Sequence, residues 1–454
     1  MQKDKYTYLN LLTFSILNLW DVKRYTSVTN LEFANRVRLR DILVPYSKSI
    51  TKNEIIDNQW RIIAKINFGG DLFLREFDEV STYKGNLTLV PENSIIFSKI
   101  NVRHGCIYFH DKGKTPFCVS SEYPTFVFDE TKVNGAFLQM LLRTSEFKKL
   151  LNSKSTGISK ARVKKDEFLD IEIPLPDFIE QESIVNDYNL KIEQAKQLDN
   201  EALELERGIE EYLFNELGVN HGIIKANKNN SFLDFINYQD IERWALSYIF
   251  KNQLFSFKKV KYNIQPLKSL LKSFDGGKTP STTNKEYWDG DVNWFSAKDM
   301  KLLKLSDSED KITTYAVKNA GMKIHQPGAI LGVFRSGILR HSFPVALLEK
   351  QATINQDLKA MVFDNNQVDN LYALYYMHVF QKLILEQAQK TGVTVESINT
   401  DEFMEIPFVV PPLETQKGLA KCIAEMKSKI SDLKRNAELS KETAQKEFEK
   451  EIFN

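Results

Sequence analysis

The residues best able to contact a phosphate group lie at 275–281, which reads Asp-Gly-Gly-Lys-Thr-Pro-Ser. Backbone amides, a lysine and hydroxyl groups can bind phosphate oxygens, and such side chains can also reach base edges. A nucleotide-binding P-loop is excluded, because the position where it needs a glycine, five before Gly277, is Lys272, and Pro280 would disturb the helix that must follow. The alternative is a tight turn held by the two tryptophans that follow. The candidate nucleic-acid contacts in and after this segment are Lys278, Thr279, Ser281 and Lys298.

A basic loop follows a predicted strand in each half of the chain. The stretch 329–334 predicts a strand and leads into Arg335 to His341, and 94–97 predicts a strand that leads into 99–105. Arginine can form paired hydrogen bonds with guanine or with phosphate. A solvated loop at a strand end is the alternative. The candidates are Arg335, Ser336, Arg340 and His341 in the second half, and Lys48, Lys99, Arg103 and His104 in the first.

Catalytic or metal-binding chemistry has little support. The three cysteines form no Cys-x-x-Cys, the six histidines form no His-Glu-x-x-His, and no Gly-x-Gly-x-x-Gly occurs. A DNA methyltransferase motif would place Asn or Asp before Pro-Pro, but Val410 precedes the Pro-Pro at 411–412. We therefore expect a binding protein, with no catalytic residue and no metal site.

The segments that must position these candidates occur twice. Gly-Ile-Ser at 157–159 matches Gly-Val-Thr at 392–394, and Asp-Glu-Phe at 166–168 matches Asp-Glu-Phe at 401–403. The two members of each pair are separated by the same number of residues, and the same separation lies between Gln181 and Gln416. We call this separation the repeat spacing. Constant spacing over a long stretch indicates a duplication. In each repeat we expect a helical stretch (133–151 and 368–390), a short strand, prolines and then a long charged segment.

The two charged segments, 178–218 and 413–454, predict long helices. Their apolar residues recur every three or four positions, which is the pattern of a coiled-coil seam. A helix of this length spans roughly 60 Å. The residues expected to pack between helices are Tyr188, Ile192, Ala195, Leu198, Leu205, Ile209, Leu419, Ile423, Met426, Ile430 and Leu433.

Composition indicates a folded protein whose charge is segregated. Hydrophobic residues make up 42% of the 454 residues and charged residues 27%. The net charge of the whole chain is +1. It is the sum of −8 on residues 178–218, +1 on residues 413–454 and +8 on the rest of the chain. Basic domains beside an acidic helix fit the binding of a polyanion.

Targeting and membrane signals are weak. No apolar run reaches the length of a membrane span, and we interpret 9–20 as folded structure rather than a signal peptide. With three irregularly spaced cysteines, this indicates a reducing compartment, and we expect a cytoplasmic protein without a membrane partner.

In these features the chain resembles the specificity subunit of type I restriction-modification systems. The run Gly-Lys-Thr-Pro-Ser…Tyr-Trp-Asp-Gly…Asn-Trp-Phe-Ser at 277–296 resembles a target recognition domain of that family, and 406–416 resembles its entry into a spacer helix. Residues 20–25 and 243–248 resemble the family's domain starts. The resemblance covers nearly the whole chain. The first repeat departs from it, because 41–48 stand where the Gly-Lys-Thr run is expected, so DNA contacts transfer poorly onto that half.

The resemblance implies an α/β fold with two target recognition domains, each followed by a long helix, the two helices pairing as an antiparallel coiled coil. The domains that we expect are recognition domain 1 at 1–177, a central spacer helix at 178–218, a linker at 219–241, recognition domain 2 at 242–412 and a C-terminal spacer helix at 413–454.

The resemblance also implies a function and partners. The chain would read a bipartite double-stranded DNA target and recruit two methyltransferase subunits and up to two restriction subunits. S-adenosylmethionine, ATP and Mg would belong to those partners, with no cofactor on this chain. Three alternatives stay open: a specificity subunit of a modification-only or phage-defence methyltransferase, a coiled-coil scaffold whose repeats bind protein, and a nuclease.

Overall fold

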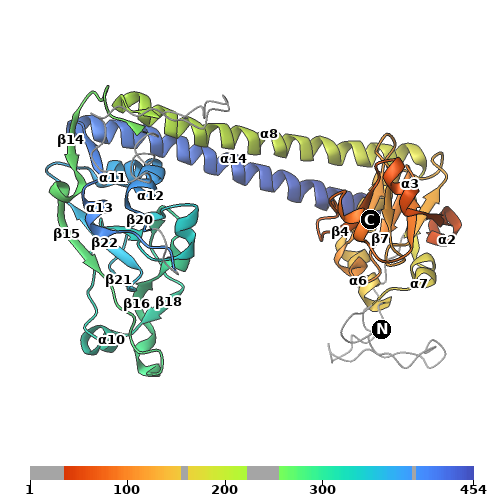
Figure 1. Ribbon diagram of the computed structural model, residues 1–454. Coiled ribbons are helices and arrows are strands. Elements are labelled where there is room, and N and C mark those ends of the chain that lie inside the picture. Colours follow the sequence, from red (N-terminus) through yellow and green to blue (C-terminus); the bar gives the residue numbers. More distant parts are fainter. Residues whose placement is uncertain (1–34, 155–161, 222–254, 391–394, 454) are drawn as a thin grey trace. The chain divides into compact units, whose positions relative to one another are not determined.

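The computed structural model describes residues 35–154, 162–221, 255–390 and 395–453 (Figure 1). It divides into two compact units: the first unit holds residues 1–197 and 436–454, and the second unit holds residues 198–435. Both mix helices and sheets, which confirms the expected α/β class. Several expected features lie outside the described residues: the domain starts at 20–25 and 243–248, the apolar stretch 9–20, most of the linker (222–241), and the repeated triplets at 157–159 and 392–394.

The first unit is built from short strands and helices that precede one long helix. The strands are β1 (Arg36–Arg38), β2 (Leu43–Tyr46), β3 (Lys48–Ile50), β4 (Arg61–Ile66), β5 (Leu72–Leu74), β6 (Leu87–Val90), β7 (Ser94–Phe97), β8 (Ile107–His110), β9 (Phe117–Val119), β10 (Thr125–Phe128) and β11 (Glu172–Pro174). The helices are α2 (Leu39–Ile42), α3 (Lys52–Asp57), α4 (Glu79–Thr82), the 3-10 turn η2 (Val102–His104), α5 (Gly135–Leu141), α6 (Ser145–Lys154), α7 (Lys165–Leu169) and α8 (Phe178–Leu217).

Two sheets form the body of the first unit. One has the strand order β2-β10-β7-β8 and the other β3-β6-β9-β4-β5, while β1 pairs with β11. The aromatic rings of Phe97, Phe126 and Phe168 pack together in the main core, with centroids 4.3–6.0 Å apart. Burial of these rings removes a large apolar area from water and fixes α7 against the first sheet.

The second unit has the same kind of architecture. Its strands are β12 (Asn220–His221), β13 (Phe255–Ser256), β14 (Asn263–Pro266), β15 (Leu271–Gly276), β16 (Trp288–Phe295), β17 (Lys304–Leu305), β18 (Asp310–Ile312), β19 (Ile330–Val333), β20 (Val345–Leu348), β21 (Ala352–Ile354), β22 (Leu358–Phe363) and β23 (Pro407–Val410). Its helices are η4 (Leu267–Leu270), η5 (Lys285–Tyr287), η6 (Ala297–Asp299), α10 (Thr314–Asn319), η7 (Gly337–Arg340), α11 (Asn370–Val379), α12 (Gln381–Ala388), α13 (Thr400–Met404) and α14 (Leu413–Phe453).

The sheets of the second unit have the orders β15-β22-β19-β20-β17 and β18-β16-β21, with β14 paired to β23 and β12 to β13. Its core is rich in tyrosine. The hydroxyls of the buried Tyr372 and Tyr376 donate to the carbonyls of Val409 and Pro407, at 2.8 and 2.9 Å. These hydrogen bonds satisfy the buried hydroxyls and tie α11 to β23.

The duplication is visible element by element. The order β2-β10-β7-β8 recurs as β15-β22-β19-β20. The repeat spacing that separates Gln181 from Gln416 also separates β9 from β21, α7 from α13, and the start of η2 from the start of η7. Both strands predicted at 94–97 and 329–334 are present, as β7 and β19. The constant spacing in the sequence therefore reflects a repeated fold.

A buried glutamine explains one of the repeated residues. Gln181 accepts a hydrogen bond from the amide of Asn134 (2.8 Å) and donates to the carbonyls of Lys132 and Pro176 (2.9 Å each). In the second unit Gln416 makes the same three bonds at 2.7–2.8 Å, and each of its partners stands one repeat spacing after its counterpart. The side chain fastens the start of each long helix to the turn that precedes α5 or α11.

The predicted helical stretches 133–151 and 368–390 are wrong in one respect: each is two helices. α5 ends at Leu141 and α6 begins at Ser145, with the buried hydroxyl of Thr144 accepting the amide of Phe147 at 3.4 Å. In the second unit α11 and α12 meet at Phe380. The apolar pattern continues across both junctions, because the residues at each bend are themselves buried in the core.

The two long helices occupy Phe178–Leu217 and Leu413–Phe453, and parts of both lie in each unit. In the first unit Tyr188 packs on Phe448, with ring centroids 6.0 Å apart, and Lys191 pairs with Glu447. In the second unit Lys429 pairs with Glu201 at 2.9 Å, and Tyr212 is hydrogen-bonded to Cys422. Within the second unit the helices thus run in opposite directions.

The residues named for helix packing differ in burial. Ala195, Ile209, Leu419, Ile423, Ile430 and Leu433 are buried, and Tyr188, Ile192, Leu198, Leu205 and Met426 are half-buried. No helix among the described residues combines the length and apolar character required to cross a membrane.

Candidate nucleic-acid interface

The Gly-Lys-Thr-Pro-Ser loop leaves the end of β15 and is fixed by backbone contacts. A side chain at Gly277 would meet the carbonyl oxygen of Ile354 at 1.9 Å, so only glycine fits this close approach. The amide of Lys278 donates to that carbonyl at 2.9 Å. The indole N–H groups of Trp294 and Trp288 donate to the carbonyls of Lys278 (3.0 Å) and Ser281 (3.1 Å).

The loop is therefore a turn held by two tryptophans, which was the alternative considered above. Its side chains are nevertheless displayed to solvent: Lys278 is exposed, the hydroxyl of Thr279 contacts the side-chain oxygen of Gln356, and the hydroxyls of Ser281 and Thr283 lie 2.9 Å apart. In this described segment no α-helix follows the loop, which agrees with the exclusion of a P-loop. A rigid backbone with exposed polar groups is suited to contact a surface rather than to enclose a nucleotide.

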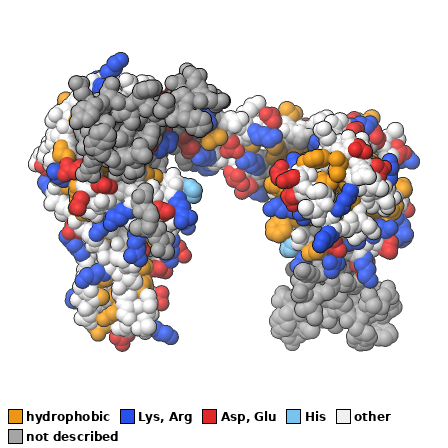
Figure 2. Space-filling model, viewed as in Figure 1, with side chains coloured by type: hydrophobic (Ala, Val, Ile, Leu, Met, Phe, Trp, Pro, Cys, Tyr) orange, Lys and Arg blue, Asp and Glu red, His pale blue; other side chains and the backbone are white. Residues whose placement is uncertain are grey.

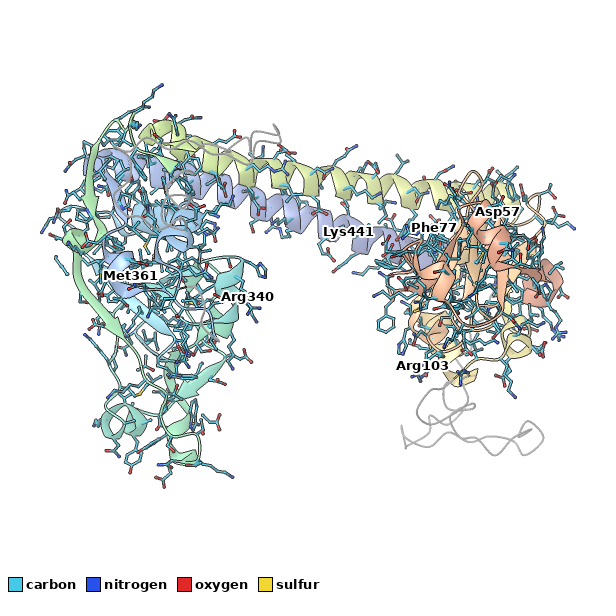
Figure 3. All side chains as sticks on the ribbon, in the orientation of Figure 1. Asp57, Phe77, Arg103, Arg340, Met361 and Lys441 are labelled. Carbon is cyan, nitrogen blue, oxygen red and sulfur yellow. The ribbon has the colours of Figure 1, made fainter. Side chains whose placement is uncertain are left out.

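The second basic loop follows β19 and forms the 3-10 turn η7. Ser336 caps this turn by accepting the amide of Ile338 at 3.4 Å. Arg335 pairs with Asp357 at 3.2 Å and Arg340 with Glu396 at 3.1 Å, and Figure 3 shows Arg340 extending from the surface of the second unit. The hydrogen bond from Arg340, together with one from Gln389, lowers the pKa of the Glu396 carboxyl.

The segment that joins β21 to β22 brings the two loops together. Ile354 binds the amide of Lys278, Gln356 contacts Thr279, and Asp357 pairs with Arg335. The candidates Lys278, Thr279 and Arg335, which come from distant parts of the sequence, thus lie around one short turn. His341 is exposed at the end of η7.

Lys298 lies elsewhere in the second unit. It belongs to η6, between β16 and β18, and it pairs with Asp310 at 2.8 Å and Glu309 at 3.5 Å. The hydrogen bond with Asp310 raises the pKa of this lysine. With two carboxylates beside it, Lys298 has less net positive charge to offer a phosphate than Lys278 does.

In the first unit Arg103 and His104 lie in the 3-10 turn η2, and Figure 3 labels Arg103 on this unit. They line a hollow of about 390 Å³ with three residues of α6: Lys148, Lys149 and Asn152. Sequence reasoning missed Lys148 and Lys149, because charges inside a predicted helix are usually part of its solvated face. The sequence of the loop that contains Arg103 does not indicate which segment of the chain packs against that loop.

The remaining candidates of the first unit are separate from this hollow. Lys48 is exposed at the start of β3, in the other sheet. Lys99 is half-buried after β7, and its amide donates to the carbonyl of Glu122 at 3.0 Å. The two basic loops also do not align residue by residue. The turns η2 and η7 start one repeat spacing apart, whereas the Arg-His pairs at 103–104 and 340–341 are further apart than that.

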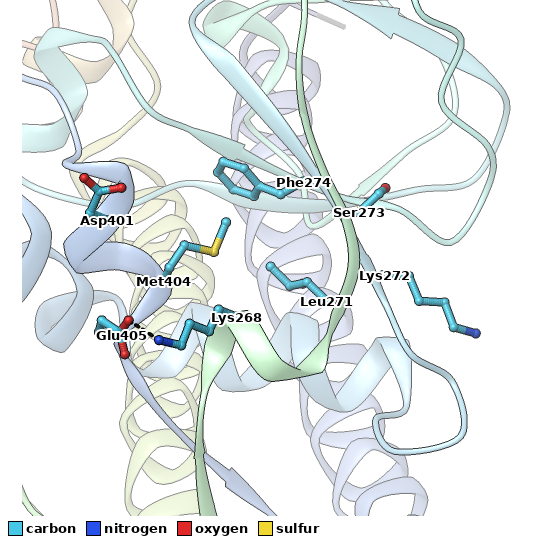
Figure 4. Close-up of a pocket in the computed structure, with 8 residues that line it drawn as sticks. All are labelled: Lys268, Leu271, Lys272, Ser273, Phe274, Asp401, Met404 and Glu405. Carbon is cyan, nitrogen blue, oxygen red and sulfur yellow. Dashed lines mark hydrogen bonds and ion pairs between the residues drawn. The ribbon is translucent and has the colours of Figure 1, made fainter.

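A second hollow, of about 590 Å³, lies in the second unit beside β15 and α13 (Figure 4). Two lysines and two carboxylates line it together with apolar residues, and Lys268 pairs with Glu405. This balanced lining does not select an anion. Among the described residues no group of three or more His, Cys, Asp or Glu side chains could hold a metal ion. In Figure 2, basic and acidic side chains are interspersed over the faces shown.

Comparison with known proteins gives the chain a family relationship. The family model for the type I restriction modification DNA specificity domain matches residues 35–211 and 259–441. The specificity subunit of the Escherichia coli type I restriction enzyme EcoR124I/EcoR124II is 31% identical over 204 residues, which are 44% of this chain and 49% of that protein. The Methanocaldococcus jannaschii type I restriction enzyme MjaIX specificity subunit is 27% identical over 175 residues, 37% of this chain and 39% of that protein. This chain therefore matches half or less of the length of each curated relative.

A solved structure supports the same fold. A chain from a study of complex assembly and conformational transition of the type I R-M system superposes with a TM-score of 0.60. The sequence identity is 15%, and the superposition covers 92% of this chain and 96% of that one. At this identity the likeness concerns the fold.

Proposed function

We propose, because this chain belongs to the type I restriction modification DNA specificity domain family, that it selects the DNA sequence on which a type I restriction-modification complex acts. The observation that carries the proposal is the repeated scaffold with unlike loops. Gln181 and Gln416 hold equivalent elements with the same three hydrogen bonds, whereas the loops that carry Lys278 and Arg103 differ between the units. A repeated scaffold with divergent loops suits a protein that reads two different half-sites.

Charge and loop chemistry support DNA as the ligand. The sequence outside the two long helices carries a net charge of +8. The loops around the turn at 354–357 present a lysine, hydroxyl groups and arginines, which are the groups that contact phosphates and base edges. Arg335 and Arg340 each pair with a single carboxylate, whereas Lys298 has two, and both guanidinium groups remain exposed to a ligand.

The long helices are proposed to set the spacing between the two half-sites. Forty residues of helix span about 60 Å, and α8 contacts α14 within each unit. We further propose that two methyltransferase subunits, and up to two restriction subunits, bind this chain. S-adenosylmethionine, ATP and Mg would then belong to those partners, and this chain would supply no cofactor site.

The first experiment is sequencing of methylated adenines in the genome of the source organism, with and without this gene. The proposal predicts that one bipartite motif loses methylation on deletion and regains it when the gene is restored. An unchanged pattern in cells that express the chain would contradict the proposal and favour the coiled-coil scaffold. The affinity of the purified chain for duplex DNA should fall as salt rises, because salt weakens phosphate contacts. An affinity that does not change with salt would also favour the scaffold.

A second experiment tests the arginines of the second unit. Arg335→Ala or Arg340→Ala should weaken binding to a duplex that carries the bipartite motif by about 1–3 kcal/mol for each arginine that reads a base. Arg207→Ala is the matched control, because this arginine lies on α8 and pairs with Glu204 at 2.9 Å. Unchanged affinity in both loop variants would remove η7 from the interface.

A third experiment tests the helices as a spacer. Insertion of about seven residues, one heptad, into both α8 and α14 adds roughly 10 Å of helix, or about three base pairs. The motif should keep both half-site sequences and change only the gap between them. A change in the bases that are read would contradict the spacer role.

A further inference from the structure

The hollow between η2 and α6 is lined by basic side chains. Arg103 and His104 come from η2, and Lys148, Lys149 and Asn152 come from α6, around a volume of about 390 Å³. No carboxylate is among these lining residues. The nearby acidic groups lie at its margin: Glu146 pairs with Lys149 at 2.7 Å, and Glu449 acts on Lys148 from α14.

Two of the lining residues carry polar groups that the free protein satisfies poorly. The Nε of Arg103 is buried and has no hydrogen-bond partner. Burial lowers the pKa of Lys148, and the neighbouring guanidinium of Arg143 lowers it further. Unpaired buried donors and crowded positive charges are costly in the free protein. A bound anion with several acceptor oxygens would relieve both at once.

A rigid turn presents an aromatic ring at the edge of this hollow. The turn 67–71 connects β4 to β5 and is closed by hydrogen bonds between Asn67 and Asp71 at 2.7–3.0 Å. Arg143 fastens it by donating to the carbonyls of Gly69 and Gly105. Phe68, at the tip of the turn, is 63% exposed, and its ring centroid lies 5.0 Å from that of His104.

The second unit shows that the scaffold does not require these charges. One repeat spacing after Arg103 and His104 stand Ile338 and Leu339, in the equivalent 3-10 turn η7. One repeat spacing after Lys148 and Lys149 stand Leu383 and Ile384, which are buried in the core of the second unit. The helix α6 therefore exposes charged residues on a face that α12 buries. At these equivalent positions the basic residues belong to the first unit alone, as expected of a ligand site rather than of a folding requirement.

We infer that the hollow lined by Arg103, His104 and Lys148 binds one phosphodiester group of duplex DNA, and that Phe68 packs against the sugar or base next to that phosphate. The inference rests on the proposed function and extends it to the first unit, where the resemblance to the family's motifs is weakest. DNA is favoured over a free nucleotide because the ring is displayed beside the charges on an exposed turn, where a polymer can pass. Aromatic rings next to phosphate-binding cations are a common arrangement in nucleic-acid binding.

The test uses the full chain and a random-sequence duplex of about 40 base pairs, titrated over a range of KCl concentrations. Each phosphate that is neutralised contributes about −0.9 to the slope of log affinity against log salt. Arg103→Ala/Lys148→Ala should therefore reduce the steepness by about 0.9 and weaken binding roughly tenfold at low salt. The conservative pair Arg103→Lys/Lys148→Arg should retain most of the wild-type slope.

The control is Lys112→Ala/Lys132→Ala, which also removes two positive charges from the first unit. Both lysines are exposed and pair with acidic residues near the opposite end of β8. This variant should change the slope by less than half as much. Equal slopes for the two double variants, with wild-type binding intact, would overturn the inference and leave the proposed function standing. Failure of the wild-type chain to bind duplex DNA in a salt-dependent way would overturn both.

The aromatic contact has its own readout. Phe68→Ala should weaken duplex binding several-fold with an unchanged salt slope, because stacking does not release counterions, and Phe68→Tyr should bind like the wild type. Thermal unfolding of each variant checks the fold. If a folded Phe68→Ala variant binds DNA as tightly as the wild type, the ring has no contact with DNA and that part of the inference is wrong.

Discussion

Gln181 in the first unit and Gln416 in the second occupy one position of a repeated fold, and each makes the same three hydrogen bonds. Arg103 and Ile338 also occupy one position of that fold, and they have nothing in common chemically. Buried polar groups need specific partners, so a change at the glutamine would leave several groups unsatisfied. A residue on a surface turn has no such constraint. The two units thus separate the part of the fold that must be retained from the part that is free to diverge.

The second sheets show the same division at a larger scale. The strands β5-β4-β9 of the first unit correspond to β18-β16-β21 of the second, with one antiparallel and one parallel pair in each. The first unit adds β6 and β3 to this sheet, whereas the second inserts η6 and β17 in the connection after β16. Additions occur at sheet edges and in connections, and they bring buried residues of their own, such as Leu89 of β6 and Leu305 of β17.

The largest expected effect concerns the glutamines. Gln181→Ala and Gln416→Ala should each lower the free energy of unfolding by about 3 kcal/mol or more, because each leaves a buried amide and two carbonyls without partners. Urea unfolding measures this loss. Gln194→Ala, on the exposed face of α8, is the control and should change stability by less than about 0.5 kcal/mol. If only one glutamine matters, the two scaffolds are not energetically equivalent.

A pH effect should distinguish the second unit from the first. His378 is half-buried beside Lys427, with 3.5 Å between the two nitrogens, and desolvation followed by the lysine charge lowers its pKa from 6.5 to about 4. Glu206 is the acidic group that acts in the opposite direction. The equivalent residue of the first unit, one repeat spacing earlier, is Arg143, which stays protonated throughout this pH range.

Well above pH 6.5 the imidazole is neutral in both the folded and the unfolded chain. As the pH falls from 6.5 towards 4, the unfolded chain gains a proton that the folded unit resists. The free energy of unfolding should therefore drop by about 2 kcal/mol between about pH 7 and about pH 5, relative to His378→Gln. Urea titrations of both proteins at the two pH values measure the difference. Parallel pH profiles would show that folding does not lower the pKa of His378.

The smallest effect concerns the indole groups of the second unit. Trp288→Phe or Trp294→Phe removes one hydrogen bond to the Gly-Lys-Thr-Pro-Ser loop and should cost about 1 kcal/mol. Hydrogen exchange of the peptide that contains Lys278 should become faster, while peptides of the first unit serve as the internal reference. An unchanged exchange rate would show that the contact of Gly277 with Ile354 holds the loop without the indoles.

The sequence predicts much of the scaffold because the repeat and the apolar spacing depend on local and periodic patterns. Both long helices begin where expected, at Phe178 and Leu413, since prolines precede them and their apolar residues recur every three or four positions. The breaks near Leu142 and Phe380 are not evident in the sequence, because buried apolar residues continue through both bends. The spacing of apolar residues indicates which residues are buried, but it does not indicate where a helix ends and the chain bends.

The candidate sites were predicted less completely than the fold. Arginine and lysine in loops are visible in the sequence, so Arg103 and Arg335 could be named. Lys148 could not, because its place beside Arg103 depends on η2 lying against α6, a contact between segments that are distant in the sequence. The carboxylate partners of Arg335 and Lys298 were equally hidden, since they too depend on tertiary contacts.

The end of α14 has a consequence for synthesis on the ribosome. Phe448 and Ile452 belong to the main core of the first unit, where Phe448 packs on Phe137 and Tyr188. The whole second unit, 198–435, is translated between the two segments that make up this first unit. At roughly 5–20 residues per second, the nascent first unit waits on the order of 10 to 50 s for the side chains that complete its core. During that interval its apolar surface stays open, because Phe448 and Ile452 are translated after the second unit.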